Sequence, residues 1–229
     1  MLSLIILIGG VSRRMGRDKA ALELAEDTLL YRLVHWAAQW TPHVVLAGRA
    51  DAWERLVPER KRAELQRFYH DLIVDGVSDA YPGKGPIAGL EAGLRKAVFP
   101  YSGLIACDMP FVSRPLMLYL YRQAVESGAC AVIPEWQGRL QPMHAVYHKG
   151  CLESLEQKLQ THPSSFSFRE WLVDVKPLRV ITETELSGLA GEDGRCFFNM
   201  NTPGDYKQAV EWVKRGEWRG RTADTEGNG

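Results

Sequence analysis

LIILIGGVSRRMGRDKAAL, from Leu4 to Leu22, is the part of this sequence from which the architecture follows. Its apolar first half ends abruptly at Gly9-Gly10 and predicts a buried β-strand. Adjacent glycines let the backbone bend tightly and turn its N–H groups towards an anion. Asp18 alone opposes the cations that follow within seven residues, which are Arg13, Arg14, Arg17 and Lys19. Because these charges would repel each other without a ligand, we interpret the stretch as a strand followed by an anion-binding loop.

This loop differs from two common phosphate-binding motifs, because neither GxxxxGK[ST] nor GxGxxG occurs in it. The alternative interpretation is a solvated basic turn whose glycines only end the strand. The chain as a whole is neutral, with 28 basic and 28 acidic residues. We therefore expect local anion recognition, and no general affinity for nucleic acid or membrane surfaces.

Length and composition are those of one soluble α/β domain, with 229 residues, 45% hydrophobic and 24% charged. The N-terminal apolar run lacks the features of a signal peptide, and no stretch predicts a membrane span. The cysteines are widely spaced and form no metal-binding pattern; they are Cys107, Cys130, Cys151 and Cys196. We expect reduced, mostly buried thiols in a cytoplasmic protein.

Alternating strands and helices in the first half predict a mainly parallel sheet with helices on both faces. We expect the strands at Leu4–Ile8, His43–Ala47, Leu72–Val74 and Leu104–Cys107. We expect the helices after Asp27 or Thr28, over Asp51–Phe68 with a break at Pro58, and over Gly85–Ala97 and Ser113–Ser127. The fold class is therefore α/β, with a doubly wound, Rossmann-like sheet.

The pattern changes after Gly128. Further strands are expected over Ala129–Pro134, Met143–Tyr147 and Leu178–Thr182, the first two separated by the polar turn EWQGR. Helices are expected over Cys151–Gln160, over Ser165–Val173, and in a last segment that ends near Arg215. We predict an antiparallel addition to the sheet in this half, a single domain over residues 1–218, and a disordered tail over residues 219–229.

Ligands of open α/β sheets bind beyond the carboxyl ends of the strands. This rule selects four loops, Gly9–Lys19, Ala47–Arg49, Asp75–Gly89 and Asp108–Phe111. Asp108 is expected directly after a strand and suits Mg²⁺, which prefers one or two carboxylates together with phosphate oxygens. The alternative is that Asp108 caps the following turn.

The third of these loops lies in VDGVSDAYPGKGPIAGLEAG. Asp75 is expected directly after a strand, and Gly83, Gly85 and Gly89 would let a nucleoside pack against the backbone. The alternative is a flexible turn and a helix start, in which Gly89 and Gly93 allow close helix–sheet packing. Together the loops predict a nucleoside triphosphate and Mg²⁺ at the top of the sheet.

LIGGVSRRMGRDKAAL resembles the signature LAGGxSxRMGxDKAxL of the molybdenum cofactor guanylyltransferases, a branch of the nucleotidyltransferases with this loop. The resemblance continues in order through VDG…YPGKGPIAGLEAGL, IACDMPFV, GRLQPMHAVY and FFNMNTPGDY. It implies a GTP-binding half over residues 1–128 and an acceptor-side half over residues 129–218. It also implies that GMP is transferred from GTP to the terminal phosphate of molybdopterin, with release of pyrophosphate.

The resemblance also implies roles for the matching residues. The nucleotide would be bound by Leu7, Ile8, Gly9, Gly10, Lys19, Asp75, Gly85, Gly89 and Asp108. Asp75 would face the nucleoside, and Asp108 would hold the metal. The catalytic residues would be Lys19, Arg13 and Asp108, with Arg13 placed on the triphosphate by its position and charge.

Candidates for the acceptor side are Arg139, Gln141, Asn199 and Asn201. Amides and an arginine suit the edge of a pterin and its phosphate. Alternatively, the two asparagines cap a strand and a helix, because Thr202-Pro203 resembles an N-cap followed by proline. We interpret His144 and His148 as packing or surface residues.

Two positions depart from the family pattern. Ile8 replaces the usual alanine, and VVLAGR places Leu46 or Gly48 where some members have an asparagine facing the nucleotide. We expect Asp18 to hold Lys19 or Arg14. The alternative functions are a cytidylyltransferase for the same pterin, a sugar-1-phosphate nucleotidyltransferase, and a non-catalytic protein that binds GTP or delivers the pterin. Protein partners would be cofactor-biosynthesis proteins or molybdoenzyme chaperones.

Overall fold

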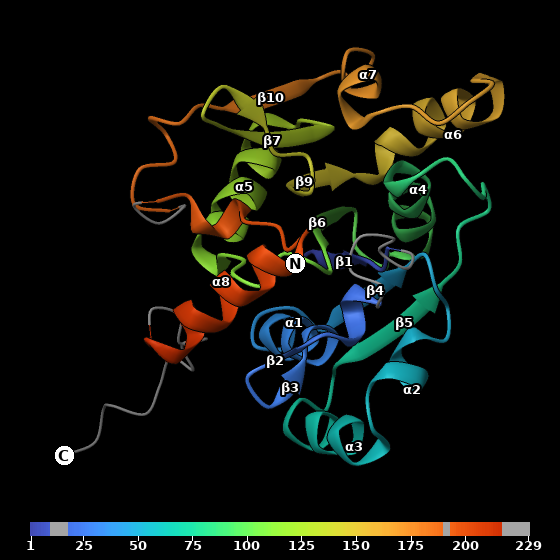
Figure 1. The fold of residues 1–229 in the computed structure, drawn as a ribbon. Helices are drawn as coiled ribbons and strands as arrows, with labels where there is room; N and C mark the ends of the chain where they lie inside the picture. Colours follow the sequence, from blue (N-terminus) through green and yellow to red (C-terminus); the bar gives the residue numbers. More distant parts are fainter. Residues whose placement is uncertain (10–17, 190–192, 217–229) are drawn as a thin grey trace.

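The structure is a computed structural model that describes residues 1–9, 18–189 and 193–216. Its main sheet has eight strands in the order β10-β7-β9-β6-β1-β4-β5, with β8 paired to β7 (Figure 1). The parallel part consists of β1 (Ser3–Leu7), β4 (His43–Ala47), β5 (Ile73–Val77) and β6 (Tyr101–Ala106). Each of its strands lies within a few residues of the predicted position.

The antiparallel addition is confirmed. Strand β9 (His144–His148) runs antiparallel to both β6 and β7 (Ala131–Trp136). The predicted turn EWQGR is the tip of a hairpin, because β8 (Arg139–Leu140) folds back on β7. Strand β10 (Leu178–Ile181) closes this edge, parallel to β7. The sheet is therefore mainly parallel and α/β, as the sequence predicts.

Helices cover both faces of the sheet. Consecutive side chains of β1 point to opposite faces, so each face presents apolar side chains that a helix layer buries. Leu4, Ile6 and Ile8 pack in a core with helices α1 (Leu29–Ala38), α2 (Ala52–Leu56), α3 (Glu59–Phe68) and α5 (Arg114–Ser127). Ile5 and Leu7 pack in a second core with α4 (Pro86–Lys96), α6 (Leu152–Thr161) and α7 (Phe168–Leu172). This alternation produces the doubly wound, three-layer architecture (Figure 1).

A third, smaller core joins the C-terminal helix α8 (Pro203–Lys214) to a two-stranded ribbon of β2 (Glu23–Leu24) and β3 (Asp27–Thr28). Its buried residues include Leu24, Phe111 and Met200. The segment that contains Met200 therefore returns to the N-terminal half of the molecule, beside the loop after β6 (Figure 1).

Capping residues start the helices where the sequence predicts. The Thr28 hydroxyl accepts from the Tyr31 N–H at the start of α1. Thr202 forms a capping box with Asp205 at the start of α8, with Pro203 in its first turn. Pro58 ends α2 and precedes α3, so the predicted break in Asp51–Phe68 is confirmed.

The close helix–sheet packing that was the alternative interpretation for Gly89 and Gly93 of α4 is present. A Cβ on Gly93 would lie 2.6 Å from Ile5 Cγ2, and one on Gly89 would lie 2.8 Å from Leu7 Cδ2. Both distances are shorter than a carbon–carbon contact allows. These glycines therefore set how closely α4 approaches β1.

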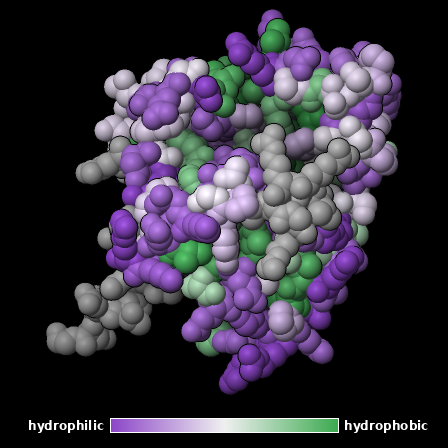
Figure 2. Space-filling model, in the orientation of Figure 1, coloured by the Kyte–Doolittle hydropathy of each residue, from purple (hydrophilic) through white to green (hydrophobic). Residues whose placement is uncertain are grey.

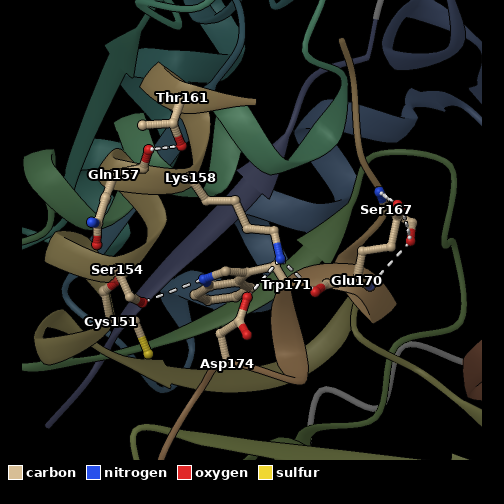
Figure 3. A network of polar contacts seen from close by, with 9 residues as sticks. All are labelled: Cys151, Ser154, Gln157, Lys158, Thr161, Ser167, Glu170, Trp171 and Asp174. Atoms are coloured by element: carbon tan, nitrogen blue, oxygen red, sulfur yellow. Dashed lines mark hydrogen bonds and ion pairs between the residues drawn. The ribbon is translucent and has the colours of Figure 1, made fainter. Parts of the chain in front are cut away.

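Helices α6 and α7 are joined by polar contacts around a buried tryptophan (Figure 3). Lys158 Nζ donates to the Glu170 carbonyl at 2.7 Å and to Asp174 Oδ2 at 2.6 Å. Trp171 is fully buried and donates its indole N–H to Ser154 Oγ at 3.4 Å. Because these contacts tie a short helix to a longer one, α7 is held over the second core.

None of the helices in the described ranges has the combination of length and apolar character that a membrane crossing requires. Hydrophilic residues cover most of the face shown in Figure 2, with apolar residues visible in gaps between them. All four cysteines are unpaired, and three of them are buried. Burial raises the pKa of the thiols of Cys107, Cys151 and Cys196 to about 12, so these thiols are uncharged near neutral pH.

Candidate functional site

A cavity of about 940 Å³ lies at the carboxyl ends of β1, β4 and β6. Strands β4 and β5, which follow β1 in the chain, lie on one side of β1, and β6 lies on its other side. The order in which strands are added to the sheet therefore reverses at β1. Such a switch point opens a crevice in an α/β sheet. All four predicted loops contribute to the lining, through Gly9 and Lys19, Gly48, five residues between Asp79 and Gly89, and Asp108 with Met109. The volume is at the upper end of the range for small-molecule sites.

Lys19 is the centre of the polar contacts in this cavity. Its Nζ atom donates to Asp108 Oδ2 at 2.6 Å and to Asn201 Oδ1 at 2.8 Å. The 3₁₀ turn Lys19–Ala21, capped by the Asp18 carboxylate, positions the lysine after the first loop. Lys19 is 89 residues from Asp108 and 182 residues from Asn201 in the chain. The contacts therefore join the first loop, the loop after β6 and the C-terminal segment.

Asp108 has one oxygen that no described residue uses. Oδ2 accepts from Lys19, whereas Oδ1 is buried without a hydrogen-bond partner among the described residues. Its main-chain carbonyl accepts from the Met200 N–H at 2.9 Å, which fixes the segment carrying both asparagines. A free carboxylate oxygen inside a cavity is a suitable ligand for a hard cation. No group of three His, Cys, Asp or Glu side chains able to hold a metal occurs within the described ranges, so a cation here would need oxygens from its substrate.

Asp18 contacts an arginine that was not among its expected partners. Its Oδ2 accepts from Arg49 Nη1 at 2.5 Å, and its Oδ1 accepts from the Ala20 N–H. Arg49 follows β4, which is the neighbour of β1 in the sheet. Arg14 lies outside the described residues, and no described contact links Asp18 to Lys19. Asp18 thus ties the first loop to the loop after β4, a pairing set by strand order.

Most predicted nucleotide-side residues line the cavity. They are Leu7, Ile8, Gly9, Lys19, Gly85, Gly89 and Asp108. Gly10 and Arg13 lie outside the described residues. The Ile8 side chain packs in the first core, so its larger size is accommodated by protein. Leu46 is buried in the same core, and Gly48 is the residue that lines the cavity.

Gly48 also fixes the shape of the cavity floor. It has a φ of +113°, and a Cβ there would lie 2.6 Å from the Ile8 carbonyl oxygen. A side chain at this position would both strain the backbone and push β1 and β4 apart. The position therefore offers main-chain atoms alone to a ligand.

The expectation that Asp75 directly follows a strand is wrong, and its role of facing a nucleoside stays a prediction. Strand β5 extends to Val77, so Asp75 lies inside it. Its carboxylate is 3.2 Å from His43 Nε2 and 3.4 Å from Lys96 Nζ, and it is not among the residues that line the cavity. The acid that lines the cavity is Asp79, two residues beyond the strand. Asp79 stands in the stretch VSDAYPG, but it was not among the predicted site residues, because the strand was predicted to end three residues too early.

Three of the four predicted acceptor-side residues line the cavity, namely Gln141, Asn199 and Asn201. Arg139 does not, because the hairpin of β7 and β8 carries it to an exposed position next to the turn at Gln137 and Gly138. Asn199 also donates to the Phe197 carbonyl at 2.9 Å, and the Asn201 N–H donates to Asp205. The capping role of Thr202 and the contact of Asn201 with Lys19 are thus both present.

The two histidines of β9 have packing roles, as predicted. His144 is fully buried, with Nδ1 3.2 Å from the Cys196 carbonyl, and burial lowers the pKa of its imidazole to about 4. His148 packs on Tyr101 with a ring-centroid distance of 4.6 Å. Neither lines the cavity.

The site therefore combines an ammonium, a carboxylate with one unused oxygen, side-chain amides and glycine backbone. An ammonium and free N–H groups bind anions such as phosphates, and a carboxylate can hold a cation that bridges them. Cys107 also lines the cavity, but burial raises the pKa of its thiol to about 12, so the thiol is uncharged near neutral pH. This arrangement suits group transfer between phosphates by positioning and charge neutralisation.

Comparisons with known proteins agree with this geometry. Residues 4–175 match the family model described as the MobA-like NTP transferase domain. A protein of Syntrophotalea carbinolica named "Molybdenum cofactor guanylyltransferase" is 31% identical, over 93% of this chain and 91% of that protein. One of Pelotomaculum thermopropionicum, named "Probable molybdenum cofactor guanylyltransferase", is 33% identical over 90% of each chain.

Solved structures share the architecture. Molybdopterin-guanine dinucleotide biosynthesis protein A from Archaeoglobus fulgidus has a TM-score of 0.72 and 26% identity, covering 93% of this chain and 99% of that chain. The 2-C-methyl-D-erythritol 4-phosphate cytidylyltransferase from Thermus thermophilus has a TM-score of 0.59 and 17% identity, covering 93% and 98%. The second similarity concerns the fold alone.

Proposed function

Because this chain belongs to the family of MobA-like NTP transferase domains and is therefore a nucleotidyltransferase, we propose a specific reaction for it. It transfers GMP from GTP to the terminal phosphate of molybdopterin, which can carry molybdenum, and releases pyrophosphate. The relatives named as molybdenum cofactor guanylyltransferases support this choice of substrates, since they align over about nine-tenths of the chain.

The observation that carries the proposal is the contact of Lys19 with Asp108 and Asn201 inside one cavity. Lys19 and Asp108 come from the half assigned to GTP, and Asn201 comes from the half assigned to the acceptor. A reaction between two phosphate compounds needs both substrates at one point, and these residues mark that point. The shared cavity also supports treating residues 1–218 as one catalytic domain.

The chemistry follows from the groups present. The terminal phosphate of the pterin attacks the α-phosphorus of GTP in line with the departing pyrophosphate. A phosphate monoester is already anionic near neutral pH, so no strong base is required. Lys19 neutralises charge on the phosphates, and the backbone from Leu7 to Gly9 lines the place where the nucleotide lies. Arg13 would add a second cation to the triphosphate.

The residues present fit a Mg²⁺ ion, because one buried oxygen of Asp108 has no hydrogen-bond partner among the described residues while its other oxygen bonds to Lys19. Asp108 would hold the ion together with oxygens of the bound phosphates. When bound, Mg²⁺ supplies charge neutralisation and orientation of the phosphates. Gln141 and Asn199, which line the same cavity, would orient the pterin through their amides. We place the reaction in the cytoplasm and expect transient transfer of the product to cofactor-biosynthesis proteins or molybdoenzyme chaperones.

The test is pyrophosphate release by the purified protein with GTP, Mg²⁺ and molybdopterin, compared with the same reaction containing CTP. We expect release with GTP and a guanine dinucleotide product in the mass spectrum. Pyrophosphate release with CTP but not with GTP would replace the proposal with cytidylyl transfer. Release with a sugar 1-phosphate and GTP in the absence of the pterin would replace it with sugar nucleotide synthesis.

A further inference from the structure

Asp79 lines the cavity and has a buried oxygen, Oδ1, to which no described residue donates a hydrogen bond. A carboxylate can only accept hydrogen bonds, so this oxygen requires a donor. A buried polar atom without a partner destabilises the empty protein, and a ligand that brings a donor removes that cost.

The order of the strands places Asp79 far from the phosphate end of the cavity. Asp79 is two residues beyond β5, and Asp108 is two residues beyond β6. Strands β5 and β6 are separated by β4 and β1 in the sheet, which makes three strand spacings. With about 4.8 Å per spacing, the carboxyl ends of β5 and β6 are about 14 Å apart along the sheet. A nucleotide whose phosphates lie at Lys19 and Asp108 would therefore direct its base towards Asp79.

The wall beside Asp79 leaves room for a planar ring. Gly83 and Gly85 both have positive φ values, near +80°, and a Cβ at either position would meet nothing within 4 Å. Pro86 and Ala47 add apolar surface to the same cavity. Small and apolar groups next to one carboxylate form a site that can take the flat face of a base and bond to one of its edges.

We propose that the Asp79 carboxylate is the group that selects guanine, by accepting hydrogen bonds from N1–H and the N2 amino group. Guanine presents these two donors side by side, which matches the two oxygens of one carboxylate. Cytosine and adenine each place a ring nitrogen acceptor beside their amino group, and that lone pair repels a carboxylate. This inference rests on the proposed function, since it takes GTP as the nucleotide.

The experiment is to measure dissociation constants of GTP, ITP and 2′-deoxy-GTP with Mg²⁺ for the wild-type protein and for Asp79→Ala. ITP lacks the N2 amino group, and 2′-deoxy-GTP lacks the ribose hydroxyl. We expect wild-type protein to bind GTP about tenfold or more tightly than ITP, because one hydrogen bond to a charged group is lost. Asp79→Ala should weaken GTP binding by about tenfold to hundredfold and should remove the preference over ITP.

The matched control is Asp71→Asn, which changes an exposed carboxylate two residues before β5, at the end of the strand away from the cavity. We expect this variant to bind GTP as wild-type protein does, with thermal unfolding used to show that both variants are folded. Equal affinity for GTP and ITP in wild-type protein would overturn the inference. The inference would also be overturned if Asp79→Ala weakened the binding of GTP but not that of 2′-deoxy-GTP, because the carboxylate would then bind the ribose.

The two proposals fail in different ways. Selective binding of GTP through Asp79 without transfer to molybdopterin would refute the proposed reaction and leave the base-selecting role intact. Transfer to molybdopterin that uses GTP and ITP with equal affinity would refute the role of Asp79 and leave the reaction intact.

Discussion

Replacing Lys19 by methionine keeps the length of the side chain and removes its charge. In the structure the ammonium is 2.6 Å from Asp108 Oδ2, and both side chains are 15% exposed. The Coulomb energy of such a pair is about 6 kcal/mol at an effective dielectric constant of about 20, and most of it is offset by desolvation. Removing one partner leaves Asp108 with both oxygens unpaired among the described residues, so we expect about 2 kcal/mol lower stability.

The effect on catalysis should be larger and should be separable from that on stability. Loss of one positioned charge that stabilises a transition state costs about 3–4 kcal/mol, so kcat for pyrophosphate release should fall by about a hundredfold to a thousandfold. In the double variant Lys19→Met/Asp108→Asn the unpaired charge is gone. Its free energy of unfolding should therefore recover towards the wild-type value, while kcat stays low.

The assays are steady-state pyrophosphate release and urea unfolding of the same preparations. Lys96→Met is the control, because its ammonium is 45% exposed and pairs with Asp75 outside the cavity. That variant should keep kcat and lose less than about 1 kcal/mol of stability. A Lys19→Met variant with kcat within threefold of wild-type would refute the assigned role. A double variant no more stable than Lys19→Met would refute the electrostatic explanation of the stability loss.

Three further predictions follow from other parts of the fold. Gly93→Ala should lower the free energy of unfolding by about 1–3 kcal/mol, because its Cβ would overlap Ile5 Cγ2, and adding Ile5→Ala should relieve part of that loss in urea unfolding. Stability should fall as the pH drops from 6.5 towards 4, because the unfolded chain protonates His144 near pH 6.5, whereas in the folded state burial lowers the pKa of this imidazole to about 4. The loss reaches about 3 kcal/mol at pH 4, and a His144→Gln variant that keeps the full slope between these pH values would contradict this explanation. Asn201→Ala should lower kcat by about tenfold with GTP affinity unchanged within about threefold, since it frees Lys19 without removing its charge; a change in GTP affinity alone would indicate a different role.

Local sequence patterns determined the elements and their approximate limits. Apolar runs, capping residues and Pro58 act over a few residues, so β4, α1 and the break before α3 could be predicted from the chain alone. The position of the site could be predicted as well, because parallel strands present their carboxyl ends to one edge of the sheet. The role of Gly93 as a packing residue was among the stated alternatives, and the structure confirms it.

The particular side chains that meet in the site depend on distances that local patterns do not contain. Strand β5 is longer than predicted, and this difference moves the cavity-lining acid from Asp75 to Asp79. Arg139 is carried to the surface by a hairpin that pairs β8 with β7.

The contacts of Lys19 with Asn201 and of Asp18 with Arg49 join segments far apart in the chain. Such pairs form only after the order of the strands and the return of the C-terminal segment are set. The sequence by itself thus determined the elements and the edge of the sheet at which the cavity lies. The tertiary structure decided which charged groups face each other there. Side-chain pairing depends on strand order and register, and these are set jointly by residues that are distant in the chain.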